Sequence, residues 1–355
     1  MNRVNKLKQN DISRLLIDWY HVNMRALPWR ETSDSYKIWV SEIILQQTRV
    51  AQGLNYYLQF LKIFPTVYAL AESSENEVLK AWQGLGYYSR ARYLHEGAKS
   101  VVKLHQGKLP ETYKDIIAIK GIGEYTAAAI LSIAYNKAYA VVDGNVYRVL
   151  SRLFAIDTPI DTTAGKKRFA KLADELLDAS RPGMHNQAIM EFGALCCTPA
   201  QPLCQSCPLQ HLCEAKQLDM QFEFPVKSKK VKVRNRYFHY FFIKYKGHTY
   251  LNKRVGDDIW KNMYEFPLIE TSKDMGLSDL MSKDSFKAIF KDSEIVVHSV
   301  SNRVKHILTH QHIYAKFYVV EIVKSDLFLS EAFLKINEND IPLYPVSRLI
   351  HRHLE

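Results

Sequence analysis

All five cysteines of the chain lie in one short segment, CCTPAQPLCQSCPLQHLC, which begins at Cys196. Counted from Cys197, the spacing to Cys204, Cys207 and Cys213 is C-x6-C-x2-C-x5-C. Four thiolates at this spacing can surround one small metal centre, and both zinc and a [4Fe–4S] cluster accept four thiolates. Structural zinc sites usually carry two C-x2-C pairs, whereas this segment has one. Unliganded buried cysteines would not be expected to cluster, and Cys196 remains a fifth thiol that could replace Cys197 as a ligand.

Two carboxylates in contrasting surroundings could together cleave a glycosidic bond. Glu42, in YKIWVSEIILQQTRV, has mostly apolar neighbours three and four positions away. Burial would raise its pKa toward neutrality, as a general acid requires, although a salt-bridged core glutamate is the ordinary alternative. Asp143, in AYAVVDGNVYRVLSRL, precedes a helix whose amides and dipole favour the ionised form, and taken alone it resembles a helix cap. A proton donor and an anion that supports a sugar cation are the two groups that such cleavage needs.

A glycine-containing turn in IAIKGIGEYTAAAILSIA could bind a phosphate. Gly121 and Gly123 carry no side chain to obstruct an anion, and the second helix would direct its first amides toward it. Lys120 could add a positive charge or could be a solvated turn lysine. An ordinary corner between two helices is the structural alternative.

The elements that must position these residues are mostly helical over the first two thirds of the chain. Apolar residues recur there every three to four positions, and glycine and proline interrupt the pattern. The expected helices cover residues 7–20, 36–50, 89–105, 126–134, 146–154, 164–179 and 186–195.

The sequence changes character after the cysteines. PVKSKKVKVRNR holds basic residues and no acidic one, which is typical of a solvated linker or an interaction segment. Short β-rich runs follow (YFHYFFIKY, HTYLNK, EIVVHSV and HIYAKFYVVEIV), with one helix expected near residues 277–290. These runs predict a separate α+β domain.

Composition narrows the choice of compartment and partner. The 355-residue chain carries a formal charge of +11, which suggests a polyanionic partner, and 47% of its residues are hydrophobic, as in ordinary globular proteins. No apolar run approaches the length of a membrane span or a signal sequence, so a cytoplasmic, nucleoid-associated location is expected. Thiols are kept reduced there, which favours metal ligation over disulfides.

These motifs resemble those of a known superfamily. The cysteine spacing resembles the cluster loop of the endonuclease III superfamily of DNA glycosylases, and the K-G-I-G turn resembles its helix–hairpin–helix element. The S-E-x-x-L-Q-Q-T and V-D-G-N segments resemble the adenine DNA glycosylase (MutY) branch. The resemblance implies a multidomain fold: an all-α helix–hairpin–helix glycosylase, with a six-helix lobe and an iron–sulfur lobe, followed by an α+β Nudix-like domain. It also implies a structural [4Fe–4S] cluster on Cys197, Cys204, Cys207 and Cys213.

The same resemblance implies roles for individual residues. Glu42 would protonate the adenine, and Asp143 would stabilise the sugar cation or attack it, with Tyr125 and Asn145 positioning or polarising Asp143. Tyr125 stands where lyases of the superfamily carry a lysine, so simple hydrolysis is favoured. The implied adenine pocket is Arg25, Trp29, Arg30, Leu45 and Gln187. The implied DNA-contacting residues are Gln47, Thr48, Leu85, Tyr87, Lys120, Gly121 and Gly123.

The family's last domain resembles a Nudix hydrolase and recognises 8-oxoguanine. WKNMYEFPLIE matches its W-x-x-x-x-E-F-P stretch, but no R-E-x-x-E-E array for divalent metal follows, which disfavours a pyrophosphatase. Leu308, Thr309 and His310 align with the family's Phe-Ser-His loop. Threonine keeps the hydroxyl that could bond the lesion, whereas leucine loses the stacking of the aromatic ring.

The expected domains are residues 1–25 with 136–220 (iron–sulfur lobe), 26–135 (six-helix lobe), 221–235 (basic linker) and 236–355 (Nudix-like). The expected function is removal of adenine paired with 8-oxoguanine or guanine in double-stranded DNA, by a monomer that leaves an abasic site. The alternatives are a glycosylase/lyase for oxidised pyrimidines, a non-catalytic DNA-binding protein on the same scaffold, and a nucleotide pyrophosphatase.

Overall fold

The computed structural model describes residues 6–228, 232–291, 293–324 and 327–355. The chain divides into two compact units. The first comprises Met1–Glu72 and Tyr93–Lys229, and the second comprises Ser73–Arg92 and Lys230–Glu355. Among the described residues no helix is long and apolar enough to span a membrane.

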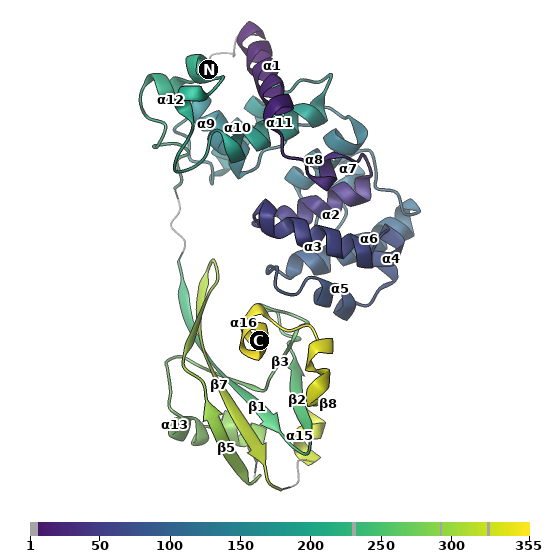
Figure 1. Ribbon diagram of the computed structural model, residues 1–355, viewed down its shortest axis with the longest axis vertical. Helices are drawn as coiled ribbons and strands as arrows, with labels where there is room; N and C mark the ends of the chain where they lie inside the picture. Colours follow the sequence, from purple (N-terminus) through teal and green to yellow (C-terminus); the bar gives the residue numbers. More distant parts are fainter. Residues whose placement is uncertain (1–5, 229–231, 292, 325–326) are drawn as a thin grey trace. The chain divides into compact units, whose positions relative to one another are not determined.

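The first unit is built from helices over its described part (Figure 1). They are α1 (Lys6–Asn23), α2 (Ser35–Leu45), α3 (Val50–Ile63), α4 (Val67–Glu72), α6 (Ser89–His105), α7 (Tyr113–Ile116), α8 (Glu124–Tyr135), α9 (Gly144–Leu153), α10 (Thr163–Leu176), α11 (Pro182–Leu195) and α12 (Glu214–Gln217). Short 3-10 turns occupy Pro28–Arg30, Cys204–Ser206 and Gln210–Leu212.

Helix α11 lies at the centre of this unit and contacts α1, α8 and α9. Apolar side chains of these helices form one buried core with α10, and Leu16, Leu150, Phe169 and Phe192 are almost completely buried in it. Helix α2 packs against both α3 and α8. These contacts bring segments that are distant in sequence to one region, since α2 and α11 both contact α8.

One predicted helix ends earlier than expected. A helix was predicted over residues 36–50, but α2 ends at Leu45 and α3 begins at Val50. Gln47 between them has a φ of 56°, a left-handed backbone conformation that a continuous helix cannot contain. The break exposes Gln47 at the surface of the unit.

The described part of the second unit contains two sheets in which most strand pairs are antiparallel (Figure 1). The larger has the order β4-β1-β7-β5, with β6 also paired to β7, and the smaller has the order β3-β2-β8. The strands are β1 (Arg234–Lys244), β2 (His248–Lys253), β3 (Tyr264–Glu265), β4 (Leu268–Thr271), β5 (Ile295–Val300), β6 (Val304–Ile307), β7 (Gln311–Ile322) and β8 (Leu334–Asn337). The long strands β1 and β7 run parallel, and β7 is antiparallel to β5 and β6.

Helices complete the second unit. They are α5 (Glu75–Ala81), α13 (Leu277–Met281), α14 (Asp284–Phe290), α15 (Leu327–Ala332) and α16 (Arg348–Leu354), with a 3-10 turn at Glu338–Leu343. Leu280 of α13 and Phe286 and Phe290 of α14 cover one face of the larger sheet, where Phe241 and Tyr318 are buried. Helix α5 belongs to this unit, and its Glu75 accepts a hydrogen bond of 2.6 Å from Asn262.

Candidate active site

A cavity of about 500 Å³ in the first unit brings together most of the predicted catalytic and adenine-binding residues. Its wall comes from α2, α8, α9 and α11, from the 3-10 turn at Pro28–Arg30, and from the loop after α2. The residues that the sequence singled out and that line it are Arg25, Trp29, Arg30, Glu42, Leu45, Gln47, Thr48, Tyr125, Asp143, Asn145 and Gln187.

Glu42 is a buried carboxyl on α2 with one close polar partner. Its side chain lines the cavity, and the Tyr125 hydroxyl donates a hydrogen bond of 2.6 Å to its Oε2. Burial raises the pKa of Glu42 to about 7, the Tyr125 hydrogen bond opposes the rise, and the charge of Asp143 adds to it. This rise in pKa agrees with the expected general acid, and Glu42 forms no ion pair among the described residues.

Asp143 caps α9, as its sequence position predicted. One carboxylate oxygen, Oδ1, accepts hydrogen bonds from the backbone amides of Asn145 (2.9 Å) and Val146 (2.8 Å), and Oδ2 accepts one from the Asn145 side chain (2.8 Å). Burial opposes the predicted preference of Asp143 for the ionised form. Asp143 is partly buried, and burial raises its pKa although the three hydrogen bonds act in the opposite direction.

Arg148 holds this capping arrangement from the next turn of α9. Its guanidinium donates to the Asn145 side-chain oxygen at 2.8 Å, to the Gly193 carbonyl at 2.6 Å and to the Cys197 carbonyl at 2.7 Å. The same side chain thus fixes Asn145, helix α11 and the start of the cysteine segment. Neither Arg148 nor this connection was predicted from the sequence.

Glu191 is a further cavity residue that the sequence analysis missed. It lies on α11 one turn after Gln187, almost fully buried, and it forms ion pairs with Arg25 (2.5 Å) and Arg30 (2.7 Å). Burial pushes the pKa of Glu191 upward, but the hydrogen bonds from Arg25 and Arg30 outweigh burial and hold it at about 2. The four-residue spacing from Gln187 was the available signal, because residues at i and i+4 share a helix face.

The glycine turn that was expected to bind a phosphate directly precedes α8. Gly121 has a φ of 84°, and a Cβ there would lie 2.8 Å from Tyr93 Cβ, so the position requires glycine. Gly123 is the N-cap of α8, and a Cβ there would meet nothing within 4 Å. The ammonium group of Lys120 lies over the Tyr93 ring at 4.8 Å. These residues lie outside the lining of the cavity that contains Glu42.

The cysteines converge on a second, small cavity of about 30 Å³. Cys196, Cys197, Cys204, Cys207 and Cys213 all line it, and none is in a disulfide. Arg152 donates a hydrogen bond of 3.4 Å to the Cys197 sulfur. In the described part of the chain no three His, Cys, Asp or Glu side chains are grouped closely enough to hold a single metal ion.

The second unit holds the remaining predicted DNA-contacting residues. Tyr87 is 47% exposed with a φ of 50°, and its hydroxyl lies 2.9 Å from that of Thr309. Leu85 is 7% exposed, so its side chain belongs to the interior of the unit. Leu308 and His310 flank Thr309 in the turn between β6 and β7.

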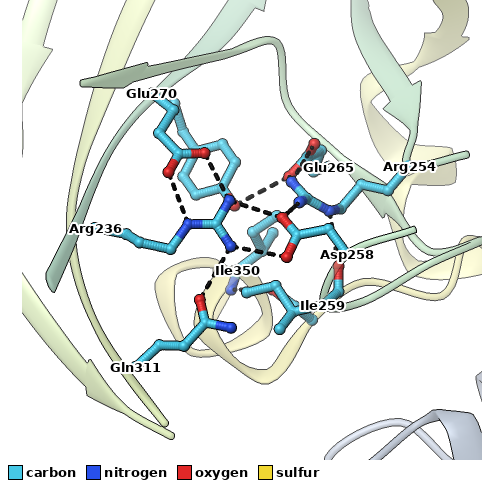
Figure 2. A network of polar contacts seen from close by, with 10 residues as sticks. Arg236, Arg254, Asp258, Ile259, Glu265, Glu270, Gln311 and Ile350 are labelled. Carbon is cyan, nitrogen blue, oxygen red and sulfur yellow. Dashed lines mark hydrogen bonds and ion pairs between the residues drawn. The ribbon is translucent and has the colours of Figure 1, made fainter. Parts of the chain in front are cut away.

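Carboxylates of the second unit are engaged by arginines (Figure 2). Arg236 is 6% exposed and binds both Asp258 (2.7 Å) and Glu270 (2.6 Å), while Arg254 binds Glu265 and Asp258 at 2.9 Å. Arg236 also donates to the side chain of Gln311, which follows His310 in sequence (Figure 2). This network ties the base of the turn that carries Thr309 to the body of the unit.

Comparison with known proteins places the chain in a family. Residues 40–175 match the HhH-GPD superfamily of base excision DNA repair proteins, and residues 239–355 match the NUDIX domain. An adenine DNA glycosylase of Buchnera aphidicola subsp. Baizongia pistaciae (strain Bp) is 33% identical over 319 residues, which cover 88% of this chain and 87% of that relative. The chain belongs to the adenine DNA glycosylase family.

Other adenine DNA glycosylases differ from the chain in length. The protein of Arabidopsis thaliana is 35% identical over 370 residues, and the match covers 89% of this chain but 59% of that longer protein. A solved thermostable thymine-DNA glycosylase superposes with a TM-score of 0.56 at 28% identity, covering 60% of this chain and 98% of the other. The helix–hairpin–helix glycosylase fold followed by a Nudix-like domain is thereby confirmed, while the finer division into lobes stays a prediction.

Proposed function

We propose that the chain is a monofunctional adenine DNA glycosylase that removes adenine paired with 8-oxoguanine or guanine. The observation that carries the proposal is one cavity that contains both Glu42, whose pKa is about 7, and Asp143. A group with this pKa is partly protonated at neutral pH and can still give up its proton. The family membership of the chain supports adenine as the substrate.

The two carboxyl groups divide the reaction between them. Glu42 donates its proton to a ring nitrogen of the adenine, and the bond from the base to the sugar breaks with both electrons leaving on the base. The ionised Asp143 stabilises the positive charge that develops on the sugar or bonds to its carbon. Water then adds at that carbon and loses a proton, which leaves an abasic site.

The surroundings of the cavity fit a purine swung out of the duplex. Trp29 and Leu45 offer apolar surfaces, while Arg30, Gln187 and Glu191 offer polar groups toward the edge of a base. No lysine is found among the described residues that line this cavity. Tyr125 contributes a hydroxyl where a Schiff base would need an amine, so hydrolysis is favoured over strand cleavage.

The cysteine cavity would hold a [4Fe–4S] cluster through Cys197, Cys204, Cys207 and Cys213. Four thiols that line one cavity, free of disulfides, form a donor set suited to iron–sulfur ligation. The cluster would act structurally, by tying the segment after α11 to the end of α9. Within the chain, Arg148 and Arg152 hold the first part of this segment through its carbonyl groups.

We propose that the second unit binds the base opposite the adenine and that both units bind double-stranded DNA. Thr309 would bond 8-oxoguanine, and the turn at Gly121–Gly123 would grip a phosphate through the first amides of α8. The net charge of +11 supports a polyanionic partner. We further propose that the protein acts as a monomer in the cytoplasm, at the nucleoid.

The test is incubation with duplexes that carry adenine opposite 8-oxoguanine, guanine or thymine, followed by alkali to cleave abasic sites. Cleavage opposite the first two bases, lost in Glu42→Gln, is the expected result. Strand cleavage without alkali, or borohydride trapping of a covalent adduct on an oxidised pyrimidine, would instead establish a lyase. Binding without any excision would establish a non-catalytic protein, and metal-dependent release of pyrophosphate from nucleotides would establish a pyrophosphatase.

A further inference from the structure

Among the described residues, no helix packs over one half of a face of the larger sheet in the second unit. Side chains of paired residues point to the same face of a sheet, so Tyr237 of β1, Tyr314 of β7 and Lys305 of β6 share this face. Further along β1 and β7 the same face carries Phe241 and Tyr318, which α13 and α14 cover. The uncovered half is therefore the part of this face that carries Tyr237 and Tyr314, beyond the side chains that α13 and α14 cover.

Two tyrosines and two cations form a continuous ridge on this half, which we call the tyrosine ridge: Tyr237, Tyr314, Arg303 and Lys305. The rings of Tyr237 and Tyr314 stack with centroids 5.2 Å apart and an angle of 17°. The guanidinium of Arg303 and the ammonium of Lys305 lie 5.4 and 5.6 Å from the Tyr314 ring centre. Stacking uses the faces of the rings, so the hydroxyl groups at the ring edges take no part in it.

The charges on and beside the ridge do not cancel. Arg303 and Lys316 both pair with Asp274, at 3.1 and 2.8 Å, while Lys305 has no acidic partner among the residues described. Three cations against one carboxylate leave a net charge of +2. Neither tyrosine hydroxyl has a hydrogen-bond partner within the described part of the chain.

We infer that the tyrosine ridge binds the sugar–phosphate backbone of duplex DNA beside the lesion. Arginine, lysine and tyrosine side chains are the groups that contact phosphates in protein–DNA complexes, and such contacts position the protein without reading the sequence. An acidic protein surface would be attracted by the same charges, but the unpartnered hydroxyls at ring edges suit the oxygen atoms of successive phosphates. This inference rests on the proposed function for the identity of the DNA substrate.

The position of the ridge along the β6–β7 hairpin fits this role. The pair Ile307 and His312 closes the turn that carries Thr309, and the pair Lys305 and Tyr314 follows two residues further along. Two residues of a strand span about 7 Å. Phosphates follow each other at about 3.4 Å of helix rise per strand, so a hairpin whose turn contacts the lesion would reach phosphates within a few nucleotides of it.

The first experiment measures how DNA affinity depends on salt for the full chain and for the double variant Arg303→Gln/Lys305→Gln. The probes are a lesion-free duplex and a duplex with 8-oxoguanine opposite a 2′-fluoro adenosine, which resists excision. Each lost phosphate contact lowers the slope of log affinity against log salt by about 0.9, so a decrease of about 2 is expected for the second probe. If the double variant has the wild-type slope on that probe, the inference is overturned and the ridge does not bind DNA phosphates.

A matched control lies at the other end of β1. Lys246 and Lys335 both lie 5.2 Å from the ring centre of Tyr245, so this tyrosine also carries two cations. No second tyrosine stacks on it among the described residues. The variant Lys246→Gln/Lys335→Gln removes the same charge from the same unit and is expected to keep the wild-type slope. An equal decrease in both double variants would mean that overall charge, not the ridge, is responsible, and would also overturn the inference.

A second variant separates the hydroxyls from the charges. Tyr314→Phe keeps the ring under Arg303 and Lys305 but removes one donor, so affinity should fall about twofold to fivefold at every salt concentration with an unchanged slope. Excision of adenine is assayed on the same proteins. If the ridge double variant lowers the salt slope but the wild-type protein excises no adenine, the proposed function is refuted and the ridge inference stands. If the wild-type protein excises adenine normally but the double variant keeps the wild-type slope, the proposed function stands and the ridge inference is refuted.

Discussion

The Glu42 carboxyl shows how one residue can be unfavourable for folding and useful for chemistry. It is buried on α2 with one hydrogen-bond donor, Tyr125, and its pKa of about 7 lies above the ordinary value of 4.5. A group whose pKa is raised in the folded state destabilises the fold once the pH exceeds the unfolded value, because the folded protein must then hold an unfavourable negative charge. That destabilisation grows between pH 4.5 and about 7 and is complete above it.

The variant Glu42→Gln should therefore be more stable than wild type at alkaline pH. A shift from 4.5 to about 7 corresponds to a stabilisation on the order of 3 kcal/mol at pH 8 and to almost none at pH 4. Chemical denaturation at the two pH values measures this difference. Equal stabilisation at both would show that the raised pKa is not its cause.

Tyr125 should tune the pH dependence of excision. The acid form of Glu42 is the active one, so the single-turnover rate should fall as the pH rises through about 7. The Tyr125 hydrogen bond lowers the pKa of Glu42, and Tyr125→Phe removes it, so the descending limb of the profile should move to higher pH. If the descending limb of the Tyr125→Phe profile stays at the wild-type pH, this coupling is contradicted. If only the maximal rate falls, Tyr125 acts in another step.

At this scale the sequence predicted residue types better than their environments. Glu42 could be identified because apolar neighbours surround it within its own helix. Asp143 lines a cavity whose wall also comes from α2, α8 and α11, and nothing local to V-D-G-N indicates its burial. Glu191 was missed for a similar reason, since its partners Arg25 and Arg30 lie more than 160 positions away in the chain.

At the scale of elements, the crossing of α9 and α11 sets the position of Asp143. Gly193 of α11 lies against the backbone of Asn145, and a Cβ at Gly193 would come within 2.6 Å of Asn145 Cβ and 3.1 Å of its Cα. The close approach of the two helices therefore depends on the missing side chain. Arg148 bridges the same crossing through its hydrogen bond to the Gly193 carbonyl.

Gly193→Ala should move α9 and impair catalysis. Overpacking of this kind lowers the free energy of unfolding by about 1–3 kcal/mol. The better helix propensity of alanine offsets about 1 kcal/mol of this loss. The excision rate should fall more than the bound fraction of DNA, because Asp143 shifts with α9. Gly144→Ala is the control for stability, since a Cβ there meets nothing within 4 Å. A Gly193→Ala protein with full activity and stability would show that the crossing is not tight.

The cysteine segment offers a test of which thiols bind iron. Cys197→Ser should lose the cluster, whereas Cys196→Ser should keep close to four irons per chain, as measured by iron analysis. Both residues are candidates, because Cys196 lines the same cavity as Cys197. The opposite result would assign Cys196 as the fourth ligand.

Helices could be predicted where the apolar periodicity extends over several turns. The prediction failed where a short break between two helices decides the geometry. Helices near α1, α6, α9 and α11 were predicted close to their observed bounds. The break at Gln46–Arg49 was not, because a left-handed glutamine inside Q-Q-T carries no glycine or proline to signal it. That break nevertheless places Gln47 and Thr48 in the wall of the cavity.

At the scale of the whole molecule, the residues proposed for the chemistry and those proposed for reading the lesion belong to different units of one chain. The cavity residues belong to the first unit, whereas Thr309 and Tyr87 belong to the second. The chain passes between the units after residues 72, 92 and 229, so the segment 73–92 joins the second unit from the middle of the helical sequence. This assignment could not be read from composition, because segment 73–92 resembles its helical neighbours.

The separation predicts that Thr309 affects the choice of opposite base and not the chemistry. Thr309→Val removes the hydroxyl while keeping the shape, and one lost hydrogen bond of about 1 kcal/mol should lower the preference for 8-oxoguanine over guanine about fivefold. Single-turnover excision opposite guanine should stay at the wild-type rate, because Glu42 and Asp143 are untouched. Thr309→Ser, which keeps the hydroxyl, should retain the preference. Equal losses opposite both bases would mean that Thr309 supports DNA binding in general, for example through its contact with Tyr87.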